Sequence, residues 1–238
     1  PSAVFYTGDS ATTALPLDLS TQASIGRQYD ALTSNLRSGQ VYTLANGTTP
    51  LAYGGGTVTA LLAVDPVTGA LTGASVGLST PVSVGYNTGI FAGFDRVVLH
   101  DGATNQVYSI ALPSGVVTNV GTVATPSRMG CESWAIWGVA EYFGGTLYET
   151  YVANSTTVER MALPSGVRTT VATFSSLSDM CSFTVSLATN RWYFHHEGGS
   201  QFRSGDETVG YCSAAFTVGG GTGEVLPAPE VCDNVDNN

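Results

Sequence analysis

Hydrophobic and polar residues alternate over short stretches along most of this chain, and Gly, Pro, Asn and Ser interrupt them at close intervals. Stretches of this kind, rich in Val, Ile, Thr and Tyr, predict β-strands with one buried face. Two sets of four such strands are expected, at 88–94, 96–101, 105–112 and 116–123 and at 134–139, 146–152, 157–163 and 167–174. No stretch has the 3.6-residue period of an amphipathic helix, so the pattern predicts an all-β protein.

The four-strand set is a repeat. The pentapeptide Leu-Pro-Ser-Gly-Val at 112–116 returns at 163–167, in each case between the third and fourth strands of a set. Proline presets the turn and glycine accepts a positive φ, so these pentapeptides are expected to be structural hairpin turns. Further copies are expected at 30–36, 40–44, 59–64 and 70–76, at 183–187, 191–196, 208–216 and 223–226, and, as the last three strands of a set, at 3–7, 14–19 and 22–25.

Repeated four-stranded antiparallel units of this length are typical of a β-propeller, here with five blades. The propeller is expected to cover residues 1–227, followed by a C-terminal tail or linker at 228–238. The first strand of the fifth blade has to come from the C-terminus; the alternatives are a three-stranded blade or a strand donated by a neighbouring molecule. A two-sheet β-sandwich is the alternative fold.

Composition and charge narrow the range of partners. The 238 residues include only eight basic ones, none of them lysine, and the formal net charge is −10. Nucleic acids and anionic membrane surfaces both attract basic surfaces, so neither is expected as a partner. No apolar run reaches the roughly 18 to 20 residues of a membrane-spanning helix. Charged residues make up only 11%, and this low charge together with four cysteines predicts a secreted or cell-surface protein.

The four cysteines are expected to form two disulfides. Cys131 and Cys181 hold matching positions at the start of the first strand in consecutive blades, which would bring them close together. Cys212 and Cys232 would then tie the tail onto the outer part of the last blade. Because no Cys-x-x-Cys spacing occurs, neither a redox role nor a zinc site is expected.

Ligands usually bind where loops differ between repeats, which here is the face formed by the loops after the second and fourth strands of each set. His100 and His195 hold equivalent positions at the end of a second strand on this face, and they either contact a ligand or finish half-exposed strands. The rest of the candidate ligand-binding set is aromatic or acidic: Tyr29, Tyr86, Trp134, Glu132 and Asp179. Aromatic rings bind sugars or peptides, although in short strands they often pack between blades instead.

Catalytic motifs are absent from the sequence. It contains no nucleophile elbow, zinc-protease signature or phosphate-binding loop, so no catalytic residue is predicted. Paired acids such as Glu132 and Asp179 are the residue types that glycoside hydrolysis requires, and their separation would decide whether they cooperate.

The C-terminal residues 229–238 read Pro-Glu-Val-Cys-Asp-Asn-Val-Asp-Asn-Asn. They resemble the Glu-x-Cys-Asp-Gly-x-Asp-Asn-Asp-Cys-Asp repeat found in secreted and surface proteins of myxobacteria and related bacteria, where it is regarded as a metal-binding motif. The resemblance implies Asp233, Asp236 and Asn238 as oxygen ligands of a calcium ion, the one cofactor expected. Asn234 replaces the glycine of the motif, and its second cysteine is missing. The resemblance therefore points to a bacterial extracellular origin more than to an intact ion site.

These features favour a secreted bacterial binding or scaffold module that recognises a glycan, a polymer or a protein. Two other functions stay open. The low charge and the incomplete fifth blade suit a subunit of an extracellular fibre or layer assembled by strand or tail exchange. An extracellular hydrolase or lyase on the same face is the third, because β-propellers carry many chemistries.

Overall fold

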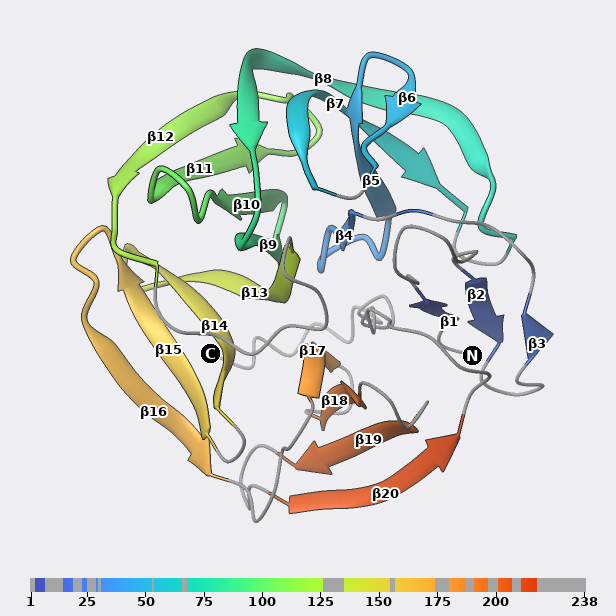
Figure 1. Ribbon diagram of the computed structural model, residues 1–238, viewed down its shortest axis with the longest axis vertical. Coiled ribbons are helices and arrows are strands. Elements are labelled where there is room, and N and C mark those ends of the chain that lie inside the picture. Colours follow the sequence, from blue (N-terminus) through green and yellow to red (C-terminus); the bar gives the residue numbers. More distant parts are fainter. Residues whose placement is uncertain are drawn as a thin grey trace.

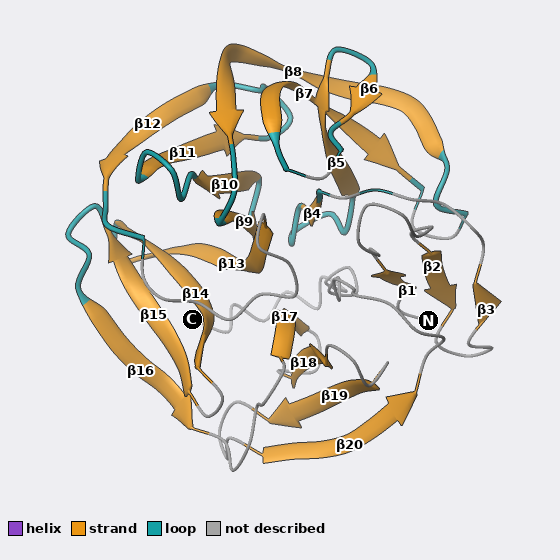
Figure 2. Ribbon diagram, viewed as in Figure 1, coloured by secondary structure: helices purple, strands orange, loops and turns teal. Residues whose placement is uncertain are grey.

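The computed structural model describes residues 29–125 except 30, 53, 66 and 67, and residues 135–173 except 155 and 156. It also describes the strand backbones at 3–6, 15–18, 23–24, 180–186, 191–196, 201–206 and 211–217. Across these residues the regular structure consists of β-strands, with turns and loops between them (Figure 2). The predicted all-β class is confirmed, and the described part of the chain contains no helix long and apolar enough to cross a membrane.

The strands form four-stranded antiparallel units and one three-stranded sheet. Unit 1 contains β4 (Leu32–Ser34), β5 (Val41–Asn46), β7 (Gly56–Val64) and β8 (Leu71–Val84), with the short β6 (Thr49–Pro50) paired to β5. Unit 2 contains β9 (Thr88–Gly93), β10 (Arg96–His100), β11 (Gln106–Ala111) and β12 (Val117–Thr122). Unit 3 contains β13 (Ala135–Phe143), β14 (Thr146–Asn154), β15 (Thr157–Leu163) and β16 (Arg168–Thr173). Unit 4 contains β17 (Met180–Ser186), β18 (Arg191–His196), β19 (Gln201–Asp206) and β20 (Tyr211–Thr217), and the three-stranded sheet contains β1 (Ala3–Tyr6), β2 (Leu15–Asp18) and β3 (Ala23–Ser24).

The units and the three-stranded sheet follow one another around a ring (Figure 1). In each unit the first strand lies nearest the middle of the ring and the fourth lies at the rim. Inner strands also pair across units. β9 and β13 run parallel, with six residues of each in register, and this pairing joins units 2 and 3 into one eight-stranded sheet. The arrangement is β-propeller-like and differs from the two stacked layers of the alternative sandwich.

The hydrophobic core lies between neighbouring units, and β10 illustrates why. Consecutive residues of a strand point to opposite sides of the sheet. Val97 and Leu99 therefore pack into the cluster shared with unit 1, while Val98 packs into the cluster shared with unit 3. All three side chains are fully buried. A strand in the interior of the ring serves two interfaces, which explains its nearly continuous hydrophobic sequence.

The repeated pentapeptides form the turns between third and fourth strands. In both copies the amide of the glycine donates to the carbonyl oxygen four residues earlier, from Gly115 to Ala111 and from Gly166 to Ala162, each at 2.8 Å. The two glycines have φ values of +71° and +72°. The turn of unit 2 also rests on β8, since a β-carbon at Gly115 would lie 1.9 Å from the carbonyl oxygen of Gly77. Glycine is thus needed for the turn and for its contact with unit 1.

The strands of unit 4 differ from the prediction. The third strand is β19 at 201–206 and the fourth is β20 at 211–217. The predicted third strand at 208–216 therefore falls on the fourth, and the predicted fourth strand at 223–226 lies outside the described residues. The register explains the difference, because Asp206 pairs with Tyr211 across a six-residue turn of the length seen at 111–116. β6, which the pattern did not predict, is an insertion between the second and third strands of unit 1.

Candidate functional site

The loops and turns of the ring lie on two faces. We call one the loop face; its described residues are 47–55 (except 53), 85–87, 101–105 and 123–125. These loops touch one another, since a β-carbon at Gly102 would lie 2.5 Å from the carbonyl oxygen of Asn87 and one at Gly54 would lie 3.4 Å from Oη of Tyr86. We call the other the hairpin face; it comprises the turns at 35–40, 65–70 (66 and 67 outside the described residues), 94–95, 111–116, 144–145 and 162–167. The predicted ligand site lies on the loop face.

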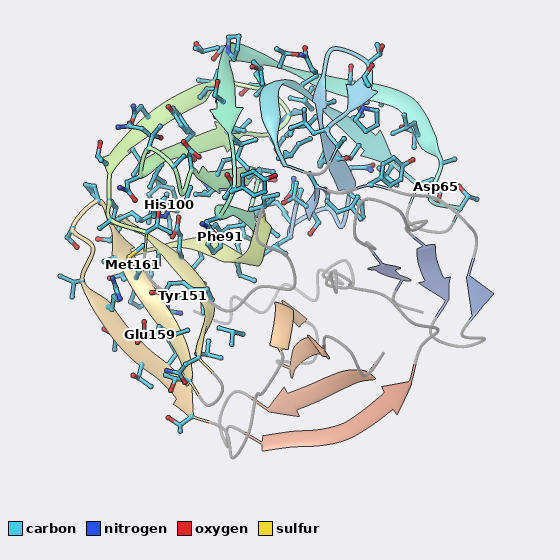
Figure 3. The ribbon with its side chains drawn as sticks, in the orientation of Figure 1. Asp65, Phe91, His100, Tyr151, Glu159 and Met161 are labelled. Carbon is cyan, nitrogen blue, oxygen red and sulfur yellow. The ribbon has the colours of Figure 1, made fainter. Side chains whose placement is uncertain are left out.

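His100, at the loop-face end of β10, pairs with Glu149 of β14 in the neighbouring unit. Its Nδ1 lies 3.1 and 3.0 Å from the two carboxylate oxygens of Glu149, and its Nε2 lies 2.8 Å from the carbonyl oxygen of Val123. Both side chains are completely buried, and His100 lies with Phe91 and Tyr151 where units 2 and 3 meet (Figure 3). The expectation that His100 finishes a half-exposed strand is therefore wrong.

The hydrogen-bond partners of His100 decide where its protons lie. A carbonyl oxygen can only accept, so Nε2 carries a proton and donates it to Val123. Nδ1 faces a carboxyl group, so a second proton lies between Nδ1 and Glu149, either as imidazolium with carboxylate or as imidazole with carboxylic acid. Both arrangements leave the pair without net charge, as burial among apolar side chains requires. The pair therefore links two units and does not present an acid or base to solvent.

Polar groups of the loop face close over this pair. Thr125 Oγ1 lies 3.3 Å from Nε2 of His100 and donates to Oδ1 of Asn105 at 2.9 Å. The backbone oxygen of Asn105 in turn accepts from the amide of Val123 at 2.8 Å. Asp101 is 4% exposed, and its carboxylate accepts hydrogen bonds from two backbone amides of its own turn. These groups stabilise the loop face from within.

His195 holds the same register position in unit 4 as His100 does in unit 2. β10 and β18 each begin with an arginine whose cross-strand partner starts a six-residue turn, and each histidine lies four residues after that arginine. The acidic partner is not repeated. In the three-stranded sheet, Val4 holds the register position that Glu149 holds in unit 3. Glu149 pairs with Met161, just before the turn at 162–167, and Val4 pairs with Leu17, just before the residues 18–23 that join β2 to β3. The His100–Glu149 contact is therefore specific to units 2 and 3 within the described residues.

The two described aromatic candidates differ in exposure. Tyr29 is 7% exposed and donates from its hydroxyl group to the carbonyl oxygen of Gly69 at 2.7 Å, so its ring belongs to the core of unit 1. Tyr86, in the loop between β8 and β9, is 54% exposed. It lies against Gly54, which has no side chain to cover the ring. Tyr86 is thus the one candidate in the described part of the chain whose ring faces solvent.

The remaining candidates are only partly placed. Cys181 is the second residue of β17, whose neighbour in the ring is β13, and Cys212 is the second residue of β20. Trp134, Glu132, Asp179, Cys131, Cys232 and the tail residues Asp233, Asp236 and Asn238 lie outside the described residues. Among the residues that are described, no three His, Cys, Asp or Glu side chains come together as a metal ion would require.

The hairpin face carries an aromatic pair outside the predicted set of site residues. Tyr142 and Phe143, at the end of β13, are 51% and 64% exposed. The guanidinium carbon of Arg96 in unit 2 lies 4.3 Å from the centre of the Tyr142 ring, a cation–π contact between the two units. The signal available in the sequence was two adjacent aromatic residues directly before the turn at Gly144.

No protein-family model and no curated protein matches this chain. Among solved structures, it is similar to the glutaminyl cyclase of Myxococcus xanthus, with a TM-score of 0.45 and 10% identity over 80% of this chain and 70% of that one. A chain of the nidogen–laminin complex is similar with a TM-score of 0.45 and 10% identity, over 94% of this chain and 80% of that one. A protein of unknown function from Bacteroides caccae is similar with a TM-score of 0.46 and 10% identity, over 94% of this chain and 97% of that one. At 10% identity, no activity of these proteins carries over to this chain.

Proposed function

We propose that this protein is an extracellular five-bladed β-propeller that binds a neutral glycan on its loop face, at Tyr86. The four units and the three-stranded sheet supply the five blades. The extracellular location rests on the low charge and the four cysteines, which suit an oxidising compartment.

The exposure of Tyr86 is the observation that carries the proposal. The side chain is 54% exposed and its hydroxyl end lies against Gly54, and exposed aromatic side chains are residue types on which sugar rings pack. Asn87 and Thr104 are exposed in two adjoining loops, and they offer an amide and a hydroxyl group for sugar hydroxyls. An aromatic surface edged by neutral polar groups is typical of binding sites.

Charge determines which kind of glycan fits. The chain has a formal net charge of −10, and none of its described arginines (Arg37, Arg96, Arg160, Arg168, Arg191 and Arg203) lies in the described loops of this face. A polyanionic polysaccharide would be repelled at low ionic strength. The proposal is therefore for neutral sugars. It is for binding without turnover because the acidic and imidazole groups of this face whose side chains are described, Asp101 and His100, are buried and hydrogen-bonded within the protein.

A panel of neutral and acidic oligosaccharides, measured by isothermal titration calorimetry with product analysis on the same samples, tests the proposal. We expect a neutral oligosaccharide to bind and to be recovered intact. Tyr86→Ala should weaken its affinity at least tenfold, corresponding to about 1.4 kcal/mol, and Tyr86→Phe should keep most of it because the ring remains.

Tyr142→Ala is the matched control, since Tyr142 is equally exposed at 51% but lies on the hairpin face. Equal losses for the Tyr86→Ala and Tyr142→Ala variants would contradict a site at Tyr86. Cleavage of any oligosaccharide would refute binding without turnover and favour the alternative function, an extracellular hydrolase or lyase.

A further inference from the structure

The hairpin face gathers most of the exposed large hydrophobic side chains in the described part of the chain. Tyr86 lies on the loop face, and the others lie in or beside hairpin turns: Leu71, Val116, Tyr142, Phe143 and Val167. Exposed apolar side chains that share one face are a mark of an interaction surface. Two of them flank the place where units 2 and 3 meet at this face, and the turns around it, at 94–95, 111–116, 144–145 and 162–167, are all described.

Arg96 lies at this place, and its guanidinium group is held in one orientation. Its Nε donates to the carbonyl oxygen of Phe94 at 3.3 Å, and its Nη1 donates to Oγ of Ser109 at 3.2 Å. The ring of Tyr142 supports it from unit 3. Gly93 leaves room for this arrangement, because a β-carbon there would lie 2.8 Å from Cγ of Arg96. A group fixed in this way loses little conformational freedom when a ligand binds.

The charge of Arg96 is not neutralised by a carboxylate within the described residues. Arg160 of unit 3, for comparison, forms an ion pair with Glu141, whereas Arg96 contacts a carbonyl oxygen, a hydroxyl group and an aromatic ring. A guanidinium group has five N–H donors, and the two hydrogen bonds of Arg96 use two of them. The donors that are left can form a bidentate contact with a carboxylate, which is one of the strong hydrogen-bonded pairs in proteins.

Exposed apolar side chains lie beside this cation. The amide of Ala111, the cross-strand partner of Arg96, donates to the carbonyl oxygen of Val116 at 2.9 Å. The next residue, Val117, packs into the core shared with unit 1, so Val116 points to the opposite side of the sheet, as Arg96 does. Val116 and Tyr142 are 49% and 51% exposed. Two strand spacings, about 10 Å, separate Val116 from Arg96, a distance that a few extended residues span.

We propose that Arg96, Tyr142 and Val116, which we call the Arg96 seam, bind an acidic segment of a partner protein. A carboxylate of the segment accepts hydrogen bonds from Arg96, and apolar side chains next to it pack on Tyr142 and Val116. Arginine and tyrosine are enriched among the residues that carry binding energy at protein interfaces. The aliphatic side chain of Val116 suits a peptide better than an acidic sugar. The proposal goes beyond the glycan site and does not rest on it.

Charge selects an acidic segment over a neutral or basic one. A neutral or basic segment would cover the guanidinium group of Arg96 without supplying a counter-charge, which costs free energy. The formal net charge of the chain is −10, and this charge repels an acidic ligand at long range. At about 0.15 M salt the repulsion is screened beyond roughly 8 Å, whereas the direct contact with Arg96 is not. Binding is therefore expected at physiological ionic strength.

An array of immobilised octapeptides, probed at physiological ionic strength, tests the proposal. Its acidic set combines Asp and Glu with Leu, Val and Phe in varied orders, and its neutral set has Asn and Gln in place of the acids. We expect the unaltered protein to bind members of the acidic set and not their neutral counterparts. Equal binding of both sets, or binding of neither, would overturn the proposal. So would binding to uronic-acid oligosaccharides in place of the acidic peptides.

Variants assign the binding to the Arg96 seam. The affinity for the best acidic peptide, measured by fluorescence anisotropy, should fall at least tenfold in Arg96→Gln and at least threefold in Val116→Ser. Arg168→Gln is the matched control and should leave the affinity unchanged, since Arg168 is exposed in β16 and forms no ion pair among the described residues. Equal losses in Arg96→Gln and Arg168→Gln would mean that net charge alone attracts the peptide, and would overturn the proposal.

Val116→Ser keeps the test decisive even where Arg96→Gln weakens the contact between units 2 and 3. Val116 is half exposed, so its replacement should leave the melting temperature nearly unchanged, and an unchanged peptide affinity in this variant would contradict the seam. Tyr86→Ala should bind the peptide as the unaltered protein does, because Tyr86 lies on the opposite face. Loss of peptide binding in Tyr86→Ala would place the peptide at the loop face and overturn the proposal.

Discussion

The buried pair of His100 and Glu149 makes a quantitative prediction about stability. Both side chains are fully buried and meet across the interface between units 2 and 3. Replacing His100 with Leu leaves the Glu149 carboxyl group without its imidazole partner in an apolar cluster, and breaking a buried pair in this way costs about 3–5 kcal/mol. Replacing Glu149 with Leu costs less, about 1–3 kcal/mol, because a neutral imidazole keeps its hydrogen bond to Val123 and loses one at Nδ1.

The double variant His100→Leu/Glu149→Leu should be more stable than either single variant. Leucine is close in volume to both residues, and exchanging a buried pair for apolar residues is often neutral or stabilising. The free energy of unfolding, measured by urea titration with circular dichroism, should therefore reveal a coupling energy of at least about 2 kcal/mol between the two positions.

The order of the three variants is the decisive result. If the double variant loses as much stability as the two single variants together, the two side chains act independently and the pair does not link the units. Thr125→Ala, which removes the 3.3 Å contact with the ring and the hydrogen bond to Asn105 but keeps the His100–Glu149 pair, is the control and should cost less than His100→Leu.

Three further predictions concern other parts of the fold. Burial raises the pKa of Tyr42 above its usual 10.0, so the folded state keeps a proton that the unfolded chain releases. The stability contributed by this group is full below pH 10 and falls as the pH rises beyond it, and an absorbance titration near 295 nm should lose one late-ionising tyrosine in Tyr42→Phe. Gly138→Ala should cost at least about 1–3 kcal/mol, since a β-carbon there would lie 2.3 Å from the carbonyl oxygen of Thr150, whereas Gly77→Ala, with nothing within 4 Å, should change the melting temperature little. Asn35→Ala should cost about 1–3 kcal/mol, because Asn35 is 7% exposed and forms hydrogen bonds with both the amide and the carboxylate of Asp95. Arg37→Ala should cost under about 1 kcal/mol, since the side chains of Arg37 and Asp95 in this ion pair are 61% and 46% exposed. Equal losses of unfolding free energy in urea titrations would contradict this ranking.

Repetition made much of the fold predictable. The strands of units 2 and 3 lie within a few residues of their predicted positions because alternation and turn residues repeat together there. Unit 4 was misassigned beyond β18. β19 reads Gln-Phe-Arg-Ser-Gly-Asp, a sequence with weak strand propensity that pairs because its neighbours hold it in register. The more strand-like residues after it, at 208–216, are the ones whose pattern predicts a third strand.

The sequence by itself determined the all-β class, the repeating unit and the turns, because each depends on residues close together in the chain. Tertiary structure decided which side chains meet. Alternation predicts that β10 has two buried faces, but it does not say that His100 lies against Glu149, which is 49 residues away. The Pro-Ser-Gly sequence likewise predicts a turn at Gly115, but it does not reveal that β8 lies too close to Gly115 for a side chain. Contacts between units depend on how two sheets face each other, and neither periodicity nor propensity carries that information.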